Sequence, residues 1–419
     1  MFKEQFIKRW NTVGCFSSRE LIFGLPVFAT AAAGGVIEHT ASISLAVLFL
    51  ASLVYVRTWS SLWRQLNAGE RVVLYCFGLY FVSAVLAYYN VNDEREYMKH
   101  LDRYFRFVLI VPVYLIVSKT GLKLFQYLLA GAVVSGPLYL GTAYFSLVDS
   151  TVINAKGSYH HITFGDMAML SALFMTTVLM VSKLDNVIKV ALTISIFCLL
   201  YASVLSQARG AWIALPVYLL FMLPLAVRHN KIKIRTILVS LIILSTLIVI
   251  SPAGKIITER VQLAANEIDL FQSGEQPITS VGSRLAMWHI AFDVWKEHPV
   301  LGTGPGDFGL EIKAAQDKGM YHNLSLYSST HNIFVQALVT TGAIGFVSLC
   351  MALFIVPFRL FYKASCESLN VASVSGMTML IAFAVFGLTE SWILRSPPVS
   401  IYLIYFVTLA STTMNGASE

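Results

Sequence analysis

Arg209 in "SQARGAW", Arg284 in "GSRLAMW" and His331 in "YSSTHNIF" are the residues of this 419-residue chain best suited to joint chemistry. A guanidinium can hold phosphate oxygens through two parallel N–H donors, so two arginines could hold a pyrophosphate. A neutral imidazole is a natural general base near pH 7, because its unperturbed pKa is about 6.5. Together they would suit the displacement of a pyrophosphate leaving group by a hydroxyl.

Arg209 and His331 each have a simpler explanation when taken alone. Arg209 and Trp212 lie between two apolar segments, where both could anchor a helix at the headgroup level. Thr330 could cap the helix that follows it, and His331 would then be an ordinary interfacial residue. A functional site therefore requires that all three residues lie on the same side of a membrane.

Arg284 is expected in the first turn of an amphipathic helix, with Ser280 or Ser283 as its N-cap. The helix macrodipole disfavours a cation at that end. An arginine beside free amide N–H groups therefore suggests a bound anion. The same helix carries an apolar stripe that predicts packing rather than a site: Trp288, Ala291, Phe292 and Trp295.

The composition identifies an integral membrane protein. Hydrophobic residues make up 57% of the chain and charged residues 13%, and the mean hydropathy is +0.69. A helix needs about 20 mostly apolar residues to span a bilayer, and the sequence predicts about 12 such segments. We expect them near 21–37, 40–56, 72–90, 104–118, 122–145, 162–182, 186–206, 211–227, 236–252, 332–357, 371–389 and 397–413.

The charges predict the orientation of these spans. The amphipathic, basic N-terminal stretch is not typical of a cleaved signal peptide. Lys and Arg gather in alternate loops, which places both termini in the cytoplasm. The net charge of +7 then reflects topology and attraction to anionic membrane lipids, not nucleic acid. All histidines except His229 fall on the outer side, so any chemistry is expected there, and none of the five cysteines is placed to form an outer disulfide.

Residues 253–330 form a long outer loop between the ninth and tenth spans. Loops of about 78 residues are usually functional or disordered. This one carries helical patterns in "KIITERVQLAANEIDLF", "SVGSRLAMWHIAFDVWKEHP" and "FGLEIKAAQDKG", which predict a helical cap packed on the span ends. Gly302, Gly304 and Gly306 are predicted to form a turn, because no Lys-Ser or Lys-Thr follows them as in a phosphate-binding loop. The chain thus divides into residues 1–252, 253–330 and 331–419.

We predict no metal and no cofactor. The sequence has neither the CxxC nor the HExxH spacing of common zinc sites. The acidic stretch "VNDEREYMKHLDR" also contains Arg95, Lys99 and Arg103, which favours a solvated or interfacial helix face over a metal site.

In this order, "SQARG", "GSRLAMW", "HPVLGTGPGDF" and "THNIFVQALVTTGAIG" resemble the O-antigen ligase family over about residues 200–350. The resemblance implies a GT-C-like fold in the inner membrane of a Gram-negative bacterium. It also implies transfer of a glycan from undecaprenyl pyrophosphate to a sugar hydroxyl of lipid A-core on the periplasmic side. By that resemblance Arg209 and Arg284 contact the donor pyrophosphate and His331 is catalytic; Asn332, Trp288, Glu390 and His161 are expected to support the site.

The chain departs from the family pattern at Ala208, where a serine is frequent, and at Thr340, where a glutamate is frequent. Neither change removes a proposed catalytic group. Glu390 in "FGLTESWILRSPP" resembles an acidic residue of the ligases. It could pair with Arg395 or orient His331, and we favour the pair with Arg395.

Three other functions remain open. An O-antigen polymerase would share the arginines and the membrane plan. A protein O-oligosaccharyltransferase is less favoured, because such enzymes usually carry a soluble C-terminal part and this chain ends about six residues after its last span. A transporter or lipid flippase would also have about 12 spans, but few charged residues lie within the membrane and no internal repeat joins the halves.

Overall fold

The computed structural model describes residues 18–148, 152–228, 258–259, 261–263, 265–269, 279–367 and 370–416. Within these ranges the regular structure is helical and contains no strand, so the predicted all-α class is confirmed. The first helices are α2 (Ser18–Ala33), α3 (Thr40–Leu53), α4 (Trp59–Gln65), α5 (Ala68–Leu86), α6 (Glu94–Lys119), α7 (Leu124–Val148), α8 (His161–Val181), α9 (Asn186–Leu205) and α10 (Arg209–Arg228). The later helices are α13 (Ser280–Glu297), α14 (Phe308–Asp317), α15 (Ile333–Leu349), α16 (Val356–Glu367), α17 (Val371–Thr389) and α18 (Ser396–Gly416).

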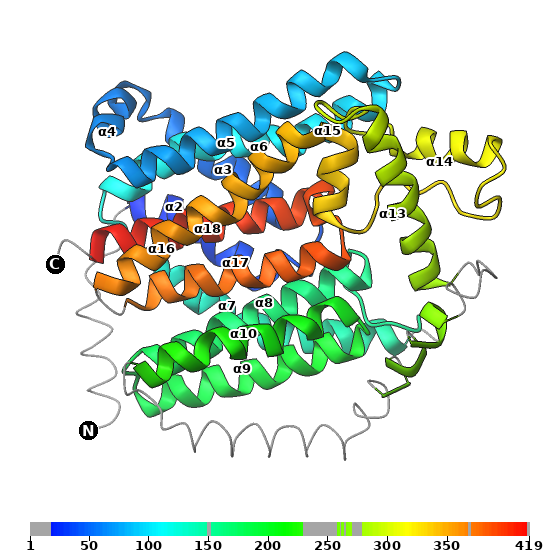
Figure 1. Ribbon diagram of the computed structural model, residues 1–419. Coiled ribbons are helices and arrows are strands. Elements are labelled where there is room, and N and C mark those ends of the chain that lie inside the picture. The colour runs from blue at the N-terminus through cyan, green and yellow to red at the C-terminus, as the bar shows by residue number, and fades with distance from the viewer. Residues whose placement is uncertain are drawn as a thin grey trace, which may run out of the picture.

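The long helices lie side by side in one bundle, and α13 and α14 lie across one end of it (Figure 1). Among the described residues 7 helices are long and apolar enough to cross a membrane, or 8 when the bent pair Thr40–Leu53 and Val56–Gln65 is counted as one span. Each predicted span within the described residues coincides with a helix. The predicted span 236–252 lies outside the described residues, so the total of about 12 stays a prediction.

The distribution of buried residues distinguishes central from peripheral helices. Most of α8, α17 and α18 is buried, whereas only a minority of α9 is buried. Large apolar side chains of α9 are exposed, among them Ile194 and Phe197, with 56% and 60% of their surface accessible. Apolar side chains on the outer surface are expected where lipid is the solvent. The bundle is therefore a polytopic membrane protein.

The cap helices share a small core with α15. Met287 and Ile290 of α13 are buried against Phe308 and Ile312 of α14, together with Val339 of α15. Two of the three predicted cap helices, α13 and α14, are thus confirmed. Of the first, the described residues 258–259, 261–263 and 265–269 are helical and the others lie outside the described part.

The predicted apolar stripe on α13 is displaced. Phe292 is 41% exposed, and the buried face consists of Ala286, Met287, Ile290 and Ala291. The reason is that α13 packs between α14 and α15, so the face turned to both of them is rotated away from Phe292. Sequence periodicity gives an apolar face but not the side from which neighbouring helices approach it.

The glycine-rich segment after α13 is a turn, as predicted, and it docks against a break in α15. Gly342 interrupts α15 with φ 62° and ψ −163°. The amides of Thr303 and Gly304 donate to the carbonyls of Val339 and Thr340 at 2.9 Å each. A Cβ at Gly302 would lie 2.5 Å from the backbone of Thr340, so only glycine allows this approach. The turn fixes the end of α13 relative to α15.

Candidate active site

A cavity of about 400 Å³ opens between the cap and the bundle. Its lining includes the start of α13, the helix that lies across one end of the bundle in Figure 1. Its walls come from the N-terminal ends of α8, α10 and α13 and from the loop before α15. Arg209, Arg284 and His331 all line this cavity. The full polar lining comprises Asn154, His160, His161, Gln207, Arg209, Glu267, Thr279, Ser280, Ser283, Arg284, Tyr327, His331 and Thr389. Residues more than 100 positions apart in the chain are thereby brought to one cavity.

Arg209 is the first residue of α10. The connection from α9 is short and turns through Gln207, whose φ is 55°. This keeps the guanidinium at the cavity, where its Nη2 donates to the hydroxyl of Ser280 at 3.4 Å. The contact links α10 of the bundle directly to the start of α13.

Arg284 lies one step further into α13 than expected. Thr279 is the N-cap, since its hydroxyl accepts from the amide of Gly282 at 3.0 Å, so neither Ser280 nor Ser283 has that role. Arg284 consequently follows the first turn, and the helix-dipole argument applies to it only weakly. The predicted cap was wrong because Thr279 has the extended backbone of an N-cap residue, with φ −88° and ψ 170°, and α13 already begins at Ser280.

The Arg284 guanidinium lacks a direct acidic partner in the described part of the chain, where no carboxylate lies within 4.0 Å of it. Burial lowers its pKa, the charge of Arg209 lowers it further, and the charge of Glu390 opposes both. Glu267, the carboxylate that lines the cavity, instead accepts from the amide of Val281 at 2.9 Å. Two guanidiniums, those of Arg209 and Arg284, therefore line one cavity, and such a pair of cations favours binding of an anion.

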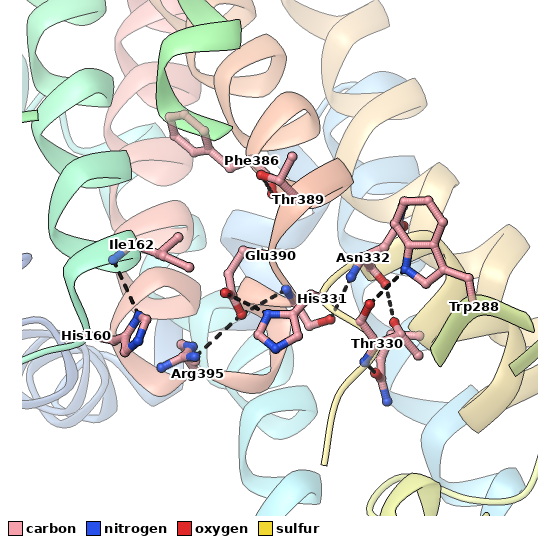
Figure 2. A network of polar contacts seen from close by, with 12 residues as sticks. His160, Ile162, Trp288, Thr330, His331, Asn332, Phe386, Thr389, Glu390 and Arg395 are labelled. Carbon is pink, nitrogen blue, oxygen red and sulfur yellow. Dashed lines mark hydrogen bonds and ion pairs between the residues drawn. The ribbon is translucent and has the colours of Figure 1, made fainter. Parts of the chain in front are cut away.

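His331 is in the left-handed backbone region, with φ 52°. Its Nδ1 lies 3.1 Å from Oε2 of Glu390 (Figure 2). Because Nδ1 faces a carboxylate, the contact favours the neutral tautomer with its proton on Nδ1 and its lone pair on Nε2. The ring of Tyr327 stands edge-on to His331, with centroids 5.8 Å apart.

Asn332 holds His331 in place by capping α15. Its side-chain oxygen accepts from the amides of Phe334 and Val335 at 2.9 and 3.2 Å. The prediction that Thr330 caps this helix was wrong, because the Thr330 hydroxyl donates to the carbonyl of Asn332 at 2.9 Å instead. The helix begins two residues later than a Thr330 cap would require, and His331 is left in the turn before it.

Glu390 makes both of the contacts that the sequence left open. Besides His331, it contacts Nη2 of Arg395 at 3.5 Å, and the bond to His331 is the shorter. Burial alone would raise the Glu390 pKa, but the hydrogen bond and charge of His331, with the charges of Arg395 and Arg284, lower it from 4.5 to about 2. The carboxylate beside His331 is thus ionised at any physiological pH.

Trp288 lies outside the lining of the cavity and contacts the loop that carries His331. Its indole N–H donates to the carbonyl of Thr330 at 2.8 Å, so α13 fixes the residue just before His331 (Figure 2). His161 lines the cavity, and its Nδ1 lies 2.8 Å from the carbonyl of Ser206. Sequence reasoning missed His160, the neighbour of His161, although the "HH" pair was a visible signal. Burial, followed by the charge of His161, lowers the pKa of His160 to about 4.

The acidic stretch before α6 serves to build the fold. Asp93 caps α6 by accepting from the amide of Glu96 at 3.0 Å. The amides of Asn92 and Asp93 donate to Asp307 at 2.6 and 3.0 Å, which ties this stretch to the glycine-rich turn. In the described ranges no group of three or more His, Cys, Asp or Glu is arranged to hold a metal ion.

The fold and cavity define a polytopic all-α membrane protein with a cationic site at one end of its bundle. Residues 194–350 match the family described as O-Antigen ligase, which confirms the resemblance to that family. The matched range contains Arg209, Arg284 and His331, whereas Glu390 lies beyond it. The match supports an enzyme of the glycosyltransferase type that performs ligase-type glycan transfer.

Two relatives extend the comparison. An uncharacterized protein of Haemophilus influenzae is 25% identical over 304 residues, which cover 71% of this chain and 74% of that protein. A ComP-specific O-oligosaccharyltransferase of Acinetobacter baylyi is 27% identical over 205 residues. That second match covers 46% of this chain and only 33% of the relative.

Proposed function

We propose that the protein is an O-antigen ligase, which transfers a glycan from undecaprenyl pyrophosphate to a sugar hydroxyl of lipid A-core. The observation that carries the proposal is the meeting of Arg209, Arg284 and His331 at one cavity, with Glu390 behind the histidine. The arginines fit the pyrophosphate of the donor. The histidine fits the acceptor hydroxyl, which must lose a proton to attack.

The reaction is a single displacement. Nε2 of His331 takes the proton of the acceptor hydroxyl while its oxygen bonds to the anomeric carbon of the donor sugar. The bond from that carbon to the pyrophosphate oxygen breaks, and the leaving pyrophosphate keeps the electron pair. Arg209 and Arg284 neutralise the charge that develops on it, and Glu390 stabilises the imidazolium. Attack opposite the leaving group inverts the anomeric configuration.

In this proposal two guanidiniums supply the positive charge that a divalent metal supplies in other transferases. The mechanism therefore needs neither a metal nor another cofactor. Addition of EDTA to the transfer assay tests this part separately. An activity that disappears in EDTA and returns with added magnesium or manganese would contradict the metal-free clamp.

The charge distribution supports placing the cavity in the periplasm. The opposite end of the bundle carries exposed basic residues, including Lys123, Lys183, Arg359 and Lys363. By the positive-inside rule that end faces the cytoplasm of a Gram-negative inner membrane, with both termini on that side. A cysteine placed at Asn154, in the lining of the cavity, should react with a membrane-impermeant maleimide from the periplasm of intact spheroplasts.

The test of function uses the purified full-length protein in nanodiscs, supplied with undecaprenyl-pyrophosphate glycan and lipid A-core. Ligation should give a lipopolysaccharide band of increased mass, and His331→Ala should abolish it. His289→Ala is the matched control, because this histidine lies on the exposed side of α13 beside Asp293. Loss of the product in both variants would contradict a specific role of His331.

The same assay separates the alternatives. A ladder of longer lipid-linked glycans without a lipid A-core product would identify a polymerase instead of a ligase. The similarity to an O-oligosaccharyltransferase justifies a further arm, in which a purified protein with exposed serine and threonine hydroxyls replaces lipid A-core. Glycan transfer to that protein alone would replace the ligase proposal.

A further inference from the structure

A second and larger cavity, of about 700 Å³, lies at the end of the bundle opposite the proposed active site. Its lining comes from the start of α5, the end of α6, the helix α16 and the last turn of α18. The polar residues of its lining include Gln65, Asn67, Glu70, Lys119, Arg359 and Lys363. None of them takes part in the proposed transfer reaction.

The inner wall of this cavity is already neutral. Glu70 is 1% exposed and accepts hydrogen bonds from the Tyr114 hydroxyl at 2.9 Å and the Asn67 amide at 2.7 Å. Lys119 pairs with the same carboxylate at 3.3 Å. The charge of Lys119 is thus neutralised by Glu70, so this wall needs no bound ion to balance its charge.

The outer wall is different, because Arg359 and Lys363 lie one helical turn apart on α16 and are exposed. Like charges at this spacing repel and destabilise an isolated helix. No carboxylate in the described ranges lies within 4.0 Å of either cation, although Glu367 is one turn further along. The pair is therefore available to an anion placed between the two side chains.

Most of the remaining lining is apolar and includes Val72, Met351, Val356 and Leu360. Glu367 is the other charged residue of the lining. Val72 and Met351 are 44% and 36% exposed, and both belong to helices that can cross the membrane. A soluble anion gains nothing from such walls, whereas acyl chains bury them.

We propose that this cavity binds one anionic phospholipid. Its phosphate lies between Arg359 and Lys363, its acyl chains run along the apolar mouth, and its headgroup hydroxyls face the carboxamides of Gln65 and Asn67. Basic pockets between membrane helices commonly bind anionic headgroups in this way. The proposal is independent of the ligase reaction, and its test measures lipid binding alone.

The experiment is native mass spectrometry of the full-length protein in detergent, titrated with phosphatidylglycerol or phosphatidylcholine. The wild type should retain one phosphatidylglycerol with an apparent Kd at least about tenfold lower than for phosphatidylcholine. The double variant Arg359→Gln/Lys363→Gln should lose this preference. Circular dichroism and size-exclusion profiles show whether the variant is folded.

The matched control is Lys123→Gln/Lys189→Gln, which removes two exposed cations at the same end but outside the cavity. It should keep the preference for phosphatidylglycerol. Ala68→Trp, which adds a bulky side chain to the lining of the cavity and leaves both cations in place, should weaken binding of the lipid. Equal binding by the double variant and the wild type, or an equal loss in the control, would overturn the proposal. Full displacement of the lipid by inorganic phosphate would replace it with a soluble-anion site.

Discussion

The indole N–H of Trp288 donates a 2.8 Å hydrogen bond to the carbonyl of Thr330, the residue directly before His331. Trp288 lies one turn beyond Arg284 on α13. A single helix therefore presents a cation to the cavity and fixes the loop that carries the proposed base. Displacement of α13 would move the pyrophosphate contact and the histidine together.

Trp288→Phe should reduce transfer roughly tenfold or more while the protein remains folded. The change removes one hydrogen bond to a buried carbonyl, which costs about 1–3 kcal/mol, and loosens the loop that positions His331. Initial rates of the transfer assay in nanodiscs measure the effect. Trp295→Phe, whose indole bonds to Pro299 at 3.2 Å away from the cavity, should transfer at nearly the wild-type rate. A similar loss in both variants would point to a general destabilisation of the cap.

Glu390→Gln should lower the transfer rate about 10²-fold or more, because the neutral amide no longer stabilises the imidazolium formed at His331. Arg395→Gln removes the longer of the two Glu390 contacts and should cost much less. The comparison of kcat for the two variants tests which contact matters. A greater loss in Arg395→Gln would favour the ion pair as the main role of Glu390.

The lowered pKa of Glu390 also predicts a dependence of stability on pH. The pKa falls from 4.5 in the unfolded chain to about 2 in the folded protein. The ionised form is thus favoured by folding, and its contribution is complete above about pH 5 and is lost as the pH falls towards 2. Thermal unfolding of wild type and Glu390→Gln should show a constant difference from pH 5 to 7 and a shrinking one below it. A difference that persists unchanged at pH 2 would contradict the assigned shift.

Arg284→Met should abolish transfer and yet raise stability in the absence of donor, by about 1 kcal/mol. The Arg284 guanidinium is partly buried near Arg209, and no carboxylate among the described residues lies within 4.0 Å of it. The substitution replaces this cation with an apolar side chain. Unfolding midpoints without donor, together with the transfer assay, give both readouts. Arg64→Met, at an exposed position of α4, should leave activity unchanged. A marked loss of stability in Arg284→Met would show that Arg284 is structural.

Gly342→Ala should be strongly destabilising, because φ is 62° and the new Cβ would meet the carbonyl oxygen of Val300 at 2.2 Å. The positive φ alone costs about 1–3 kcal/mol, and relief of the clash would separate the glycine-rich turn from α15. Gly78→Ala is the control, since nothing lies within 4 Å of its Cβ and alanine favours a helix by about 1 kcal/mol. Thermal midpoints and the yield of monodisperse protein compare the two. Equal stability of both variants would contradict the docking of the turn.

The sequence by itself determined the membrane class, the positions of most helices, the two cap helices and the three residues that meet at the cavity. These features depend on local properties, namely apolar length, helical periodicity and charge in loops, which a linear pattern records. The roles predicted for Arg209, Arg284 and His331 depend on short motifs and on their order along the chain, and both can be read from the sequence alone.

Only the tertiary structure decided the remaining features. Glu390 contacts His331 as well as Arg395, and the contact with His331 depends on the distance between segments remote in sequence. Asn332 rather than Thr330 caps α15, although both residue types can cap a helix. The buried face of α13 is set by the approach of α14 and α15, and a single amphipathic pattern does not specify it. The same reason applies to the cavity beside Arg359 and Lys363, whose walls come from four separate parts of the chain.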